Sequence, residues 1–145
     1  MANFDTYSFS DTHFVFIPTG YASYTMDGQG VGEITITYSD DLTAHDRGAD
    51  GRIAISKIKS SNGTISITVF QTSPIHKYFK TLLNRLRIAD AAFWAANTIT
   101  ISSTRGSSDN IVATGVSFTK FADQPYQEQS QRVTWNFMAA DIQQL

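Results

Sequence analysis

The stretch from Gly63 to Leu86 constrains the fold most, because a strict strand pattern runs directly into a helix start signal. In its first half, apolar side chains alternate with Thr and Ser, which places one set on each face of a pleated strand. The apolar set is Ile65, Ile67 and Val69. Ser73 then stands at an N-cap position and Pro74 at the first helical position, where its missing N–H costs nothing. The pattern predicts a strand over 64–71 followed by a helix over 74–89.

The predicted helix has one apolar stripe and one basic side. Helical spacing relates the stripe residues, which are Ile75, Phe79, Leu82, Leu83 and Leu86, so we expect this stripe to be buried. Polar side chains occupy much of the remaining surface, namely His76, Lys77, Lys80, Arg85 and Arg87. The sequence therefore predicts a helix that packs on a sheet and turns its cations outward.

The rest of the chain favours short strands separated by turns that are rich in Gly, Ser, Asn and Asp. The expected strands are Tyr7–Phe9, His13–Ile17, Gly32–Tyr38, Ile53–Lys57, Thr64–Gln71, Thr98–Ser103, Ile111–Phe121 and Arg132–Met138. This set predicts a mainly β fold, a β-sandwich or barrel with one flanking α-helix, formed by residues 1–145 as a single domain. Strand His13–Ile17 is apolar on both faces, so we expect it between two sheets, and Val133, Trp135 and Phe137 are expected in the core.

The segment Asp40–Arg52 is polar and punctuated by glycine, which predicts a projecting loop or a loose hairpin. Charge is also unevenly distributed. Acidic residues dominate 27–50 and basic residues dominate 74–90, although the formal net charge is only −2. The two blocks could meet across a contact between identical copies, or they could be two solvated surfaces whose exposed pairs contribute about 0–1 kcal/mol each.

Charged residues make up 17% of the chain, below the roughly 25% of an average soluble protein. The outward strand faces instead carry hydroxyl and amide side chains at Thr35, Thr37, Ser66, Thr68, Thr98, Thr100, Ser102, Thr134 and Asn136. Such uncharged faces suit surfaces that another subunit covers or that line a narrow space. A Thr-rich β-domain without any such role has the same composition.

No pattern for catalysis, cofactor binding or metal binding stands out. His13, His45 and His76 have no second ligand nearby in sequence, and the aspartates at 40, 41, 46 and 50 do not match a calcium-loop spacing. The chain contains no cysteine, which excludes disulfides and fits folding in a reducing cytoplasm. Neither a signal peptide nor a membrane-spanning run is visible in the sequence. We therefore expect no enzyme activity, no cofactor and no membrane association.

Three landmarks together resemble a known family. They are the opening Tyr7-Ser-Phe-Ser-Asp11, the motif Gly48-Ala-Asp-Gly51, and the run from Gly63 through Thr72-Ser-Pro74 into a helix. In this order they resemble tail tube proteins of contractile-tailed phages. The resemblance implies a β-sandwich or barrel with one flanking helix, hexameric rings that stack into a hollow tube, and a conduit for DNA ejection.

The resemblance also implies partners and a location. The partners would be further copies of the chain, the tail sheath, and baseplate or terminator proteins, while genomic DNA passes through the lumen without specific binding. The protein would be made in the host cytoplasm and belong to the virion tail. We expect the projecting loop to reach a neighbouring subunit, in the adjacent ring, through Asp40, Asp41, His45, Asp46, Arg47, Asp50 and Arg52. A second contact is expected on the basic helix face at Lys77, Lys80, Arg85 and Arg87.

A monomeric carbohydrate-binding β-sandwich is the principal alternative, since exposed aromatic residues stack on sugars. A small-molecule barrel or an enzyme is a third and weaker alternative. The size of the purified protein separates the first two, because rings or tubes indicate a tail component and a monomer that binds glycans indicates a binding module.

Overall fold

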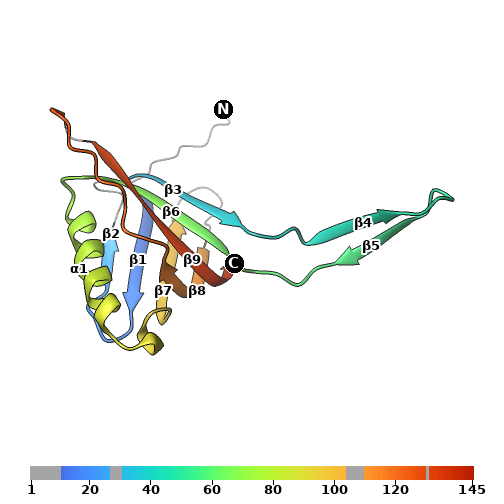
Figure 1. Cartoon of the computed structure of the whole chain (residues 1–145), viewed down its shortest axis with the longest axis horizontal. Coiled ribbons are helices and arrows are strands. Elements are labelled where there is room, and N and C mark those ends of the chain that lie inside the picture. The colour runs from blue at the N-terminus through green and yellow to red at the C-terminus, as the bar shows by residue number, and fades with distance from the viewer. Residues whose placement is uncertain (1–10, 27–30, 104–109, 130) are drawn as a thin grey trace, which may run out of the picture.

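One curled antiparallel sheet of seven strands forms the body of the protein, and a separate two-stranded hairpin projects from it (Figure 1). This computed structural model describes residues 11–26, 31–103, 110–129 and 131–145. The sheet order is β2-β1-β7-β8-β9-β6-β3. The strands are β1 (Thr12–Pro18), β2 (Tyr24–Met26), β3 (Val31–Tyr38), β4 (Thr43–Arg47), β5 (Ile53–Lys57), β6 (Gly63–Phe70), β7 (Asn97–Ser103), β8 (Asn110–Phe118) and β9 (Arg132–Gln144). The expected strand Tyr7–Phe9 lies outside the described residues.

Helix α1 (Pro74–Ile88) covers one face of this sheet, and a short 3-10 helix, η2 (Ala91–Phe93), follows it (Figure 1). All five residues of the predicted stripe are buried: Ile75, Phe79, Leu82, Leu83 and Leu86. The predicted helix is therefore confirmed, and its last helical residue is Ile88.

The core is an aromatic cluster built around Phe79 of α1. Its ring lies 5.2 Å from the ring of Phe137 and 5.6 Å from those of Phe16 and Trp135, measured between centroids. The rings meet at steep angles. Aromatic pairs in this geometry stabilise the fold by about 0.5–1.5 kcal/mol each, in addition to the contribution of their buried area. Because Phe16 belongs to β1 and the other two to β9, one helical side chain joins strands that are far apart in sequence.

The opposite face of the sheet, which we call the open face, carries no helix within the described residues and is lined mainly by hydroxyl side chains. The register aligns these residues in rows, so that Glu33, Thr68 and Thr134 face one another across β3, β6 and β9. Hydrogen bonds link neighbouring residues within these rows, among them Ser66 Oγ to Asn136 Oδ1 at 2.6 Å and the Thr68 and Thr134 hydroxyls at 3.1 Å. The predicted outward positions of the threonines are confirmed.

The expectation that a second sheet sandwiches β1 is wrong. Phe14 and Phe16 are buried under α1, whereas Ile17 lies on the open face and is 45% exposed. The mainly β fold with one flanking helix is confirmed, but its sheet is a single one curled into half a barrel. The predicted core residues Val133, Trp135 and Phe137 are buried.

The predicted loop Asp40–Arg52 is a β-hairpin that is longer than expected. Strand β4 pairs with β5 in an isolated two-stranded sheet, so Ile53–Lys57 is a strand as predicted but belongs to the projecting unit rather than to the body. Every residue of both strands is exposed. We call residues 40–59 the projecting hairpin, because Figure 1 shows this segment extending away from the body.

Candidate interaction surfaces

The projecting hairpin has two chemically different faces. Directly paired residues of antiparallel strands share a face, and the pairs Thr43/Lys57, His45/Ile55 and Arg47/Ile53 form one of them. We call this the isoleucine face. Ile53 is 56% exposed and Ile55 is 70% exposed, so this face combines apolar side chains with cations. The opposite face carries the small residues Ala44, Ala54 and Ser56 together with Asp46.

The tip of the hairpin is a tight turn over Gly48-Ala-Asp-Gly51, one of the motifs that the sequence singled out. The Gly51 amide donates to the Gly48 carbonyl at 3.0 Å, and Gly51 has a φ of 86°, which glycine adopts without strain. Asp50 accepts a hydrogen bond from the Arg52 amide at 3.1 Å and forms an ion pair with the Arg52 side chain at 3.5 Å. Two of the predicted contact residues thus hold the turn in shape, and both remain largely exposed.

The root of the hairpin, where residues 38–40 and 60–61 connect it to the sheet, is hydrogen-bonded to the end of β9. The Ile142 amide donates to the Ser61 carbonyl at 2.8 Å, and the Tyr38 hydroxyl donates to the Ile142 carbonyl at 3.2 Å. At the same place the Ser60 hydroxyl donates to Asp40 Oδ2 at 2.8 Å. These bonds fix the root where the hairpin leaves the sheet. Asp40, which the sequence analysis placed among the contact residues of the loop, is therefore a root residue.

The acidic block of 27–50 is not one surface. The projecting hairpin holds four carboxylates and four cations, so its formal charge is zero: Asp40, Asp41, Asp46, Asp50, Arg47, Arg52, Lys57 and Lys59. Arg47 and Lys57 both lie on the isoleucine face, which is cationic, while Asp46 lies on the opposite face. Glu33 belongs to the open face of the body, and Asp27 lies outside the described residues.

The cations of α1 lie on its outer side, as predicted, but they flank the helix in two directions. The Arg85 guanidinium lies 4.9 Å from the Tyr21 ring centroid, on the side of the loop that follows β1. The Arg87 guanidinium lies 5.6 Å from the Phe121 ring centroid, on the side of the segment between β8 and β9. Lys77 is exposed and Lys80 is partly buried. These four residues remain candidates for a contact.

His76 does not belong to the solvent-facing side, contrary to the sequence prediction. It is buried against β9, and Trp135 Nε1 donates a hydrogen bond to its Nδ1 at 3.0 Å. Burial lowers the pKa of His76, the Lys80 ammonium lowers this pKa further, and a hydrogen bond with Gln124 opposes both effects. A neutral His76 with its proton on Nε2 matches this geometry, because Nδ1 must stay free to accept from the indole.

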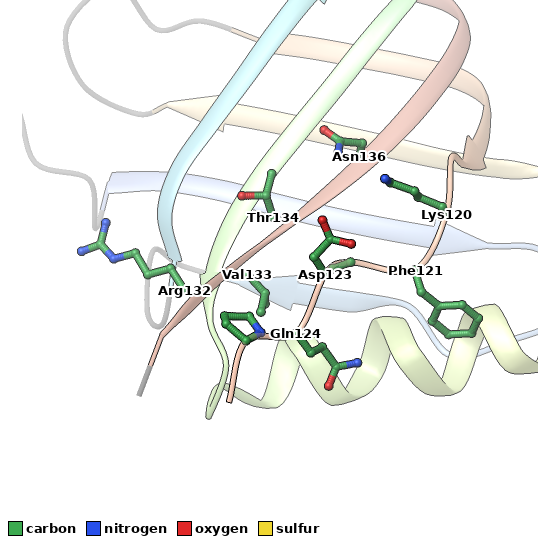
Figure 2. Close-up of a pocket in the computed structure, with 10 residues that line it drawn as sticks. Lys120, Phe121, Asp123, Gln124, Arg132, Val133, Thr134 and Asn136 are labelled. Carbon is green, nitrogen blue, oxygen red and sulfur yellow. The ribbon is translucent and has the colours of Figure 1, made fainter. Parts of the chain in front are cut away.

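A polar groove of about 510 Å³ lies between β9 and the segment that joins it to β8 (Figure 2). Asp123 and Lys120 extend from the joining segment over β9, near Thr134 and Asn136, whereas the Arg132 guanidinium points away from them (Figure 2). That guanidinium lies 5.1 Å from the Phe70 ring centroid. No local sequence pattern marks this groove, because its two walls are brought together only by the pairing of β8 with β9.

The same joining segment carries Tyr126, which is 83% exposed, and the exposed carboxylates of Asp123 and Glu128. The charged residues of the groove and this segment are Lys120, Asp123, Glu128 and Arg132, whose formal charges cancel. We call the groove together with Tyr126 and Glu128 the polar groove. In Figure 1 the joining segment lies beside α1, at the end of the molecule away from the projecting hairpin.

Two other classes of site are absent from the part of the chain that the structure describes. Across 11–26, 31–103, 110–129 and 131–145, no group of three or more His, Asp or Glu side chains is arranged to hold a metal ion. Within the same ranges, no helix combines the length and the apolar character needed to cross a membrane.

Solved structures of contractile injection machines share this fold. A chain in the cap that terminates the tube of the anti-feeding prophage matches with a TM-score of 0.60 at 11% identity, covering 100% of this chain and 93% of that one. A chain in the baseplate of the same particle gives a TM-score of 0.57 at 11% identity, covering 100% and 97%. A chain in the extended sheath-tube complex of an extracellular contractile injection system, PVC, gives 0.53 at 12%, covering 91% and 87%. At these identities the likeness is one of fold.

No curated protein sequence matches the chain closely enough to count as a relative. A sequence model of one family, however, matches residues 4–145, nearly the whole chain, and its description is bacteriophage PhiTE tail tube protein. The family is that of a structural component of the phage tail, as the resemblance in the sequence predicted. The chain therefore belongs to the bacteriophage PhiTE tail tube protein family and is a component of the virion tail.

Proposed function

We propose that this chain builds the inner tube of a contractile tail by forming hexameric rings that stack through the projecting hairpin. The observation that carries the proposal is a two-stranded hairpin whose strands are exposed throughout. An isolated two-stranded sheet is at best marginally stable in water, so a neighbouring surface is needed to cover it. The fold shared with chains of tube, cap and baseplate assemblies supports this role.

Under this proposal the open face lines the lumen, and DNA passes along it during ejection. Phosphate binding needs several convergent Lys or Arg residues and weakens steeply with salt. The open face presents mainly hydroxyl and amide groups, with Glu33 as a carboxylate at its β3 edge and with Lys120 and Asp123 beside Thr134 and Asn136. A wall of this kind lets a duplex slide. Sheath, baseplate and terminator proteins are the partners that follow from the same arrangement, and the proposal assigns the chain no catalytic activity.

Electron microscopy of the purified protein tests the assembly. We expect rings or tubes from the native chain, and folded but unstacked protein when a short Gly-Ser turn replaces Thr43–Lys57. Circular dichroism and the melting temperature should change little, because these strands bury nothing in the body. Tubes of normal length from the shortened variant would remove the hairpin from the mechanism, and a strictly monomeric native protein that binds glycans would replace the proposal with a binding module.

A DNA-binding assay tests the conduit separately. The assembled protein should show little affinity for duplex DNA at physiological salt. Submicromolar binding that weakens as salt is raised would contradict a passive lumen and would point to a nucleic-acid-binding role.

A further inference from the structure

We infer that His76 is a pH-sensitive switch, which holds the first turn of α1 on strand β9 when neutral and releases that turn when protonated. The switch is independent of the proposed function and acts in a single chain as well as in an assembly. It is built on one contact, in which Trp135 Nε1 donates a hydrogen bond to His76 Nδ1 at 3.0 Å. The two ring centroids lie 5.7 Å apart, and His76 is 5% exposed while Trp135 is fully buried.

The bond to Trp135 and a second proton on His76 exclude each other. A neutral imidazole has one nitrogen that donates and one that accepts, whereas an imidazolium has two donors and no acceptor. The indole Nε1 of Trp135 is itself only a donor, so a proton on His76 Nδ1 would place two N–H groups against each other. A buried donor without an acceptor is costly, and more so when it is charged. Protonation must therefore break this bond.

The surroundings of His76 contain no charge that would hold the imidazolium in place. The ammonium of Lys80, one turn further along α1, lowers the pKa of His76, as burial does more strongly. Lys77 is the next residue of α1, and strands β6 and β9 present uncharged side chains to the buried side of the helix. Gln124 of the joining segment hydrogen-bonds His76 and favours the protonated form, but its amide is neutral. The carboxylate of Asp123 extends instead over β9 in the polar groove (Figure 2).

The first turn of α1 is the part of the helix that this bond can free. Ser73 makes no capping bond, and Pro74 has no N–H to donate. The backbone bonds at this end run from the Ser73 amide to the Phe70 carbonyl and from the His76 amide to the Ser73 carbonyl, so they stay within one short segment. A surface groove of about 540 Å³ borders His76 and gives a rotated imidazolium a path to water. The later part of the buried stripe keeps the following turns in place.

Quenching of Trp135 fluorescence by acrylamide tests the switch in the full chain, whatever its state of assembly. The chain has two tryptophans, so Trp94→Phe leaves Trp135 as the one that is observed. In this background we expect the quenching constant to rise reversibly, by about threefold or more, between about pH 7.5 and about pH 4.5. The midpoint should lie below 6.5, the ordinary pKa of histidine, because burial and Lys80 both lower this pKa. Far-UV circular dichroism should keep its β-strand signal, since one helical turn moves and the sheet does not.

Substitutions in the same background identify the titrating group. His76→Gln keeps an acceptor for the indole and cannot be protonated, so its quenching constant should stay level over this pH range. His45→Gln on the exposed strand β4 is the matched control, and its quenching should rise as in the native chain. Lys80→Gln should move the midpoint to higher pH, because it removes the charge that opposes the imidazolium. Lys57→Gln removes an equal charge from the projecting hairpin and should leave the midpoint unchanged.

Three results would overturn the switch. They are a quenching constant that does not rise in acid, an equal rise in His76→Gln, and a rise that coincides with loss of the β-strand signal. The last result would mean that the whole body unfolds rather than one turn. None of these results bears on the tube function, which electron microscopy tests separately.

Discussion

Two segments of this chain have almost the same apolar pattern and opposite environments. In β6, Ile65 and Ile67 alternate with Ser and are fully buried beneath α1, whereas in β5, Ile53 and Ile55 alternate with Ala and are exposed. The alternation determines which side chains share a face. Whether that face is covered depends on another element, which is a helix of the same chain for β6 and, under our proposal, a second copy for β5.

The strongest test of this comparison introduces a carboxylate into the body and, separately, into the projecting hairpin. Leu82→Asp should prevent soluble folding, because an unpaired carboxylate would be buried in the core at a cost of several kcal/mol. Ile55→Asp should change the free energy of unfolding of the unassembled protein by no more than about 0.5 kcal/mol. Yield of soluble protein and chemical denaturation measure both. A stable Leu82→Asp protein would show that the stripe is not core.

The junction between the two regions should be the next most sensitive place. A Cβ at Gly63 would overlap the Thr37 carbonyl oxygen and would lie 2.9 Å from Ile142 Cδ1, so Gly63→Ala should destabilise the protein by about 1–3 kcal/mol. Gly51→Ala at the hairpin tip is the matched control. It strains a positive φ in open space, and the melting temperature of the body should stay unchanged. Equal losses from both variants would contradict the separation of hairpin and body.

The buried His76 predicts an acid sensitivity that belongs to the body alone. Because its pKa is lowered in the folded state, the unfolded chain binds the proton more tightly, and the free energy of unfolding falls as pH drops below the unfolded pKa of about 6.5. His76→Gln keeps an acceptor for the Trp135 indole and removes the titration. Its melting temperature should therefore fall less than that of the native protein between pH 8 and pH 5. Identical slopes would exclude His76 as the source.

The smallest effect concerns the start of α1. Ser73 occupies the N-cap position, but its hydroxyl makes no capping bond and has no hydrogen-bond partner among the residues that the structure describes. Ser73→Ala should therefore change the free energy of unfolding by less than about 0.5 kcal/mol, whereas a working N-cap would cost about 1 kcal/mol. A larger loss in urea denaturation would show that the hydroxyl caps the helix in solution.

The sequence predicted those elements whose formation depends on neighbouring residues. The run from Gly63 to Leu86 gave the strand, the helix and the buried stripe, because alternation and helical spacing are properties of neighbouring residues. The sequence predicts Thr43–Arg47 as part of a projecting loop or a loose hairpin since it has almost no apolar alternation, and it is a strand because β5 pairs with it. Tyr24–Met26 was missed because three residues are too few for a periodic signal.

Long-range partners explain the remaining differences. The burial of His76 depends on Trp135, which is 59 residues away in sequence, and no helical pattern contains that information. The polar groove also needs two distant segments. Its sequence signal was the polar run after β8, in which Asp123, Tyr126 and Glu128 follow one another without any apolar alternation that would bury them. The sequence alone could suggest exposure there, not a groove.

Strand β9 has a mechanical consequence. It begins at Arg132 beside the polar groove and ends at Gln144, past Ile142 where the hairpin root is fastened. Its 13 residues span about 40 Å at the usual rise per residue. In a stack joined through the projecting hairpin, a pull on the hairpin would be transmitted from its root to the backbone of β9. Such a pull would act in shear on the backbone hydrogen bonds that join β9 to β6 and β8. Many of these bonds must then break together rather than one at a time.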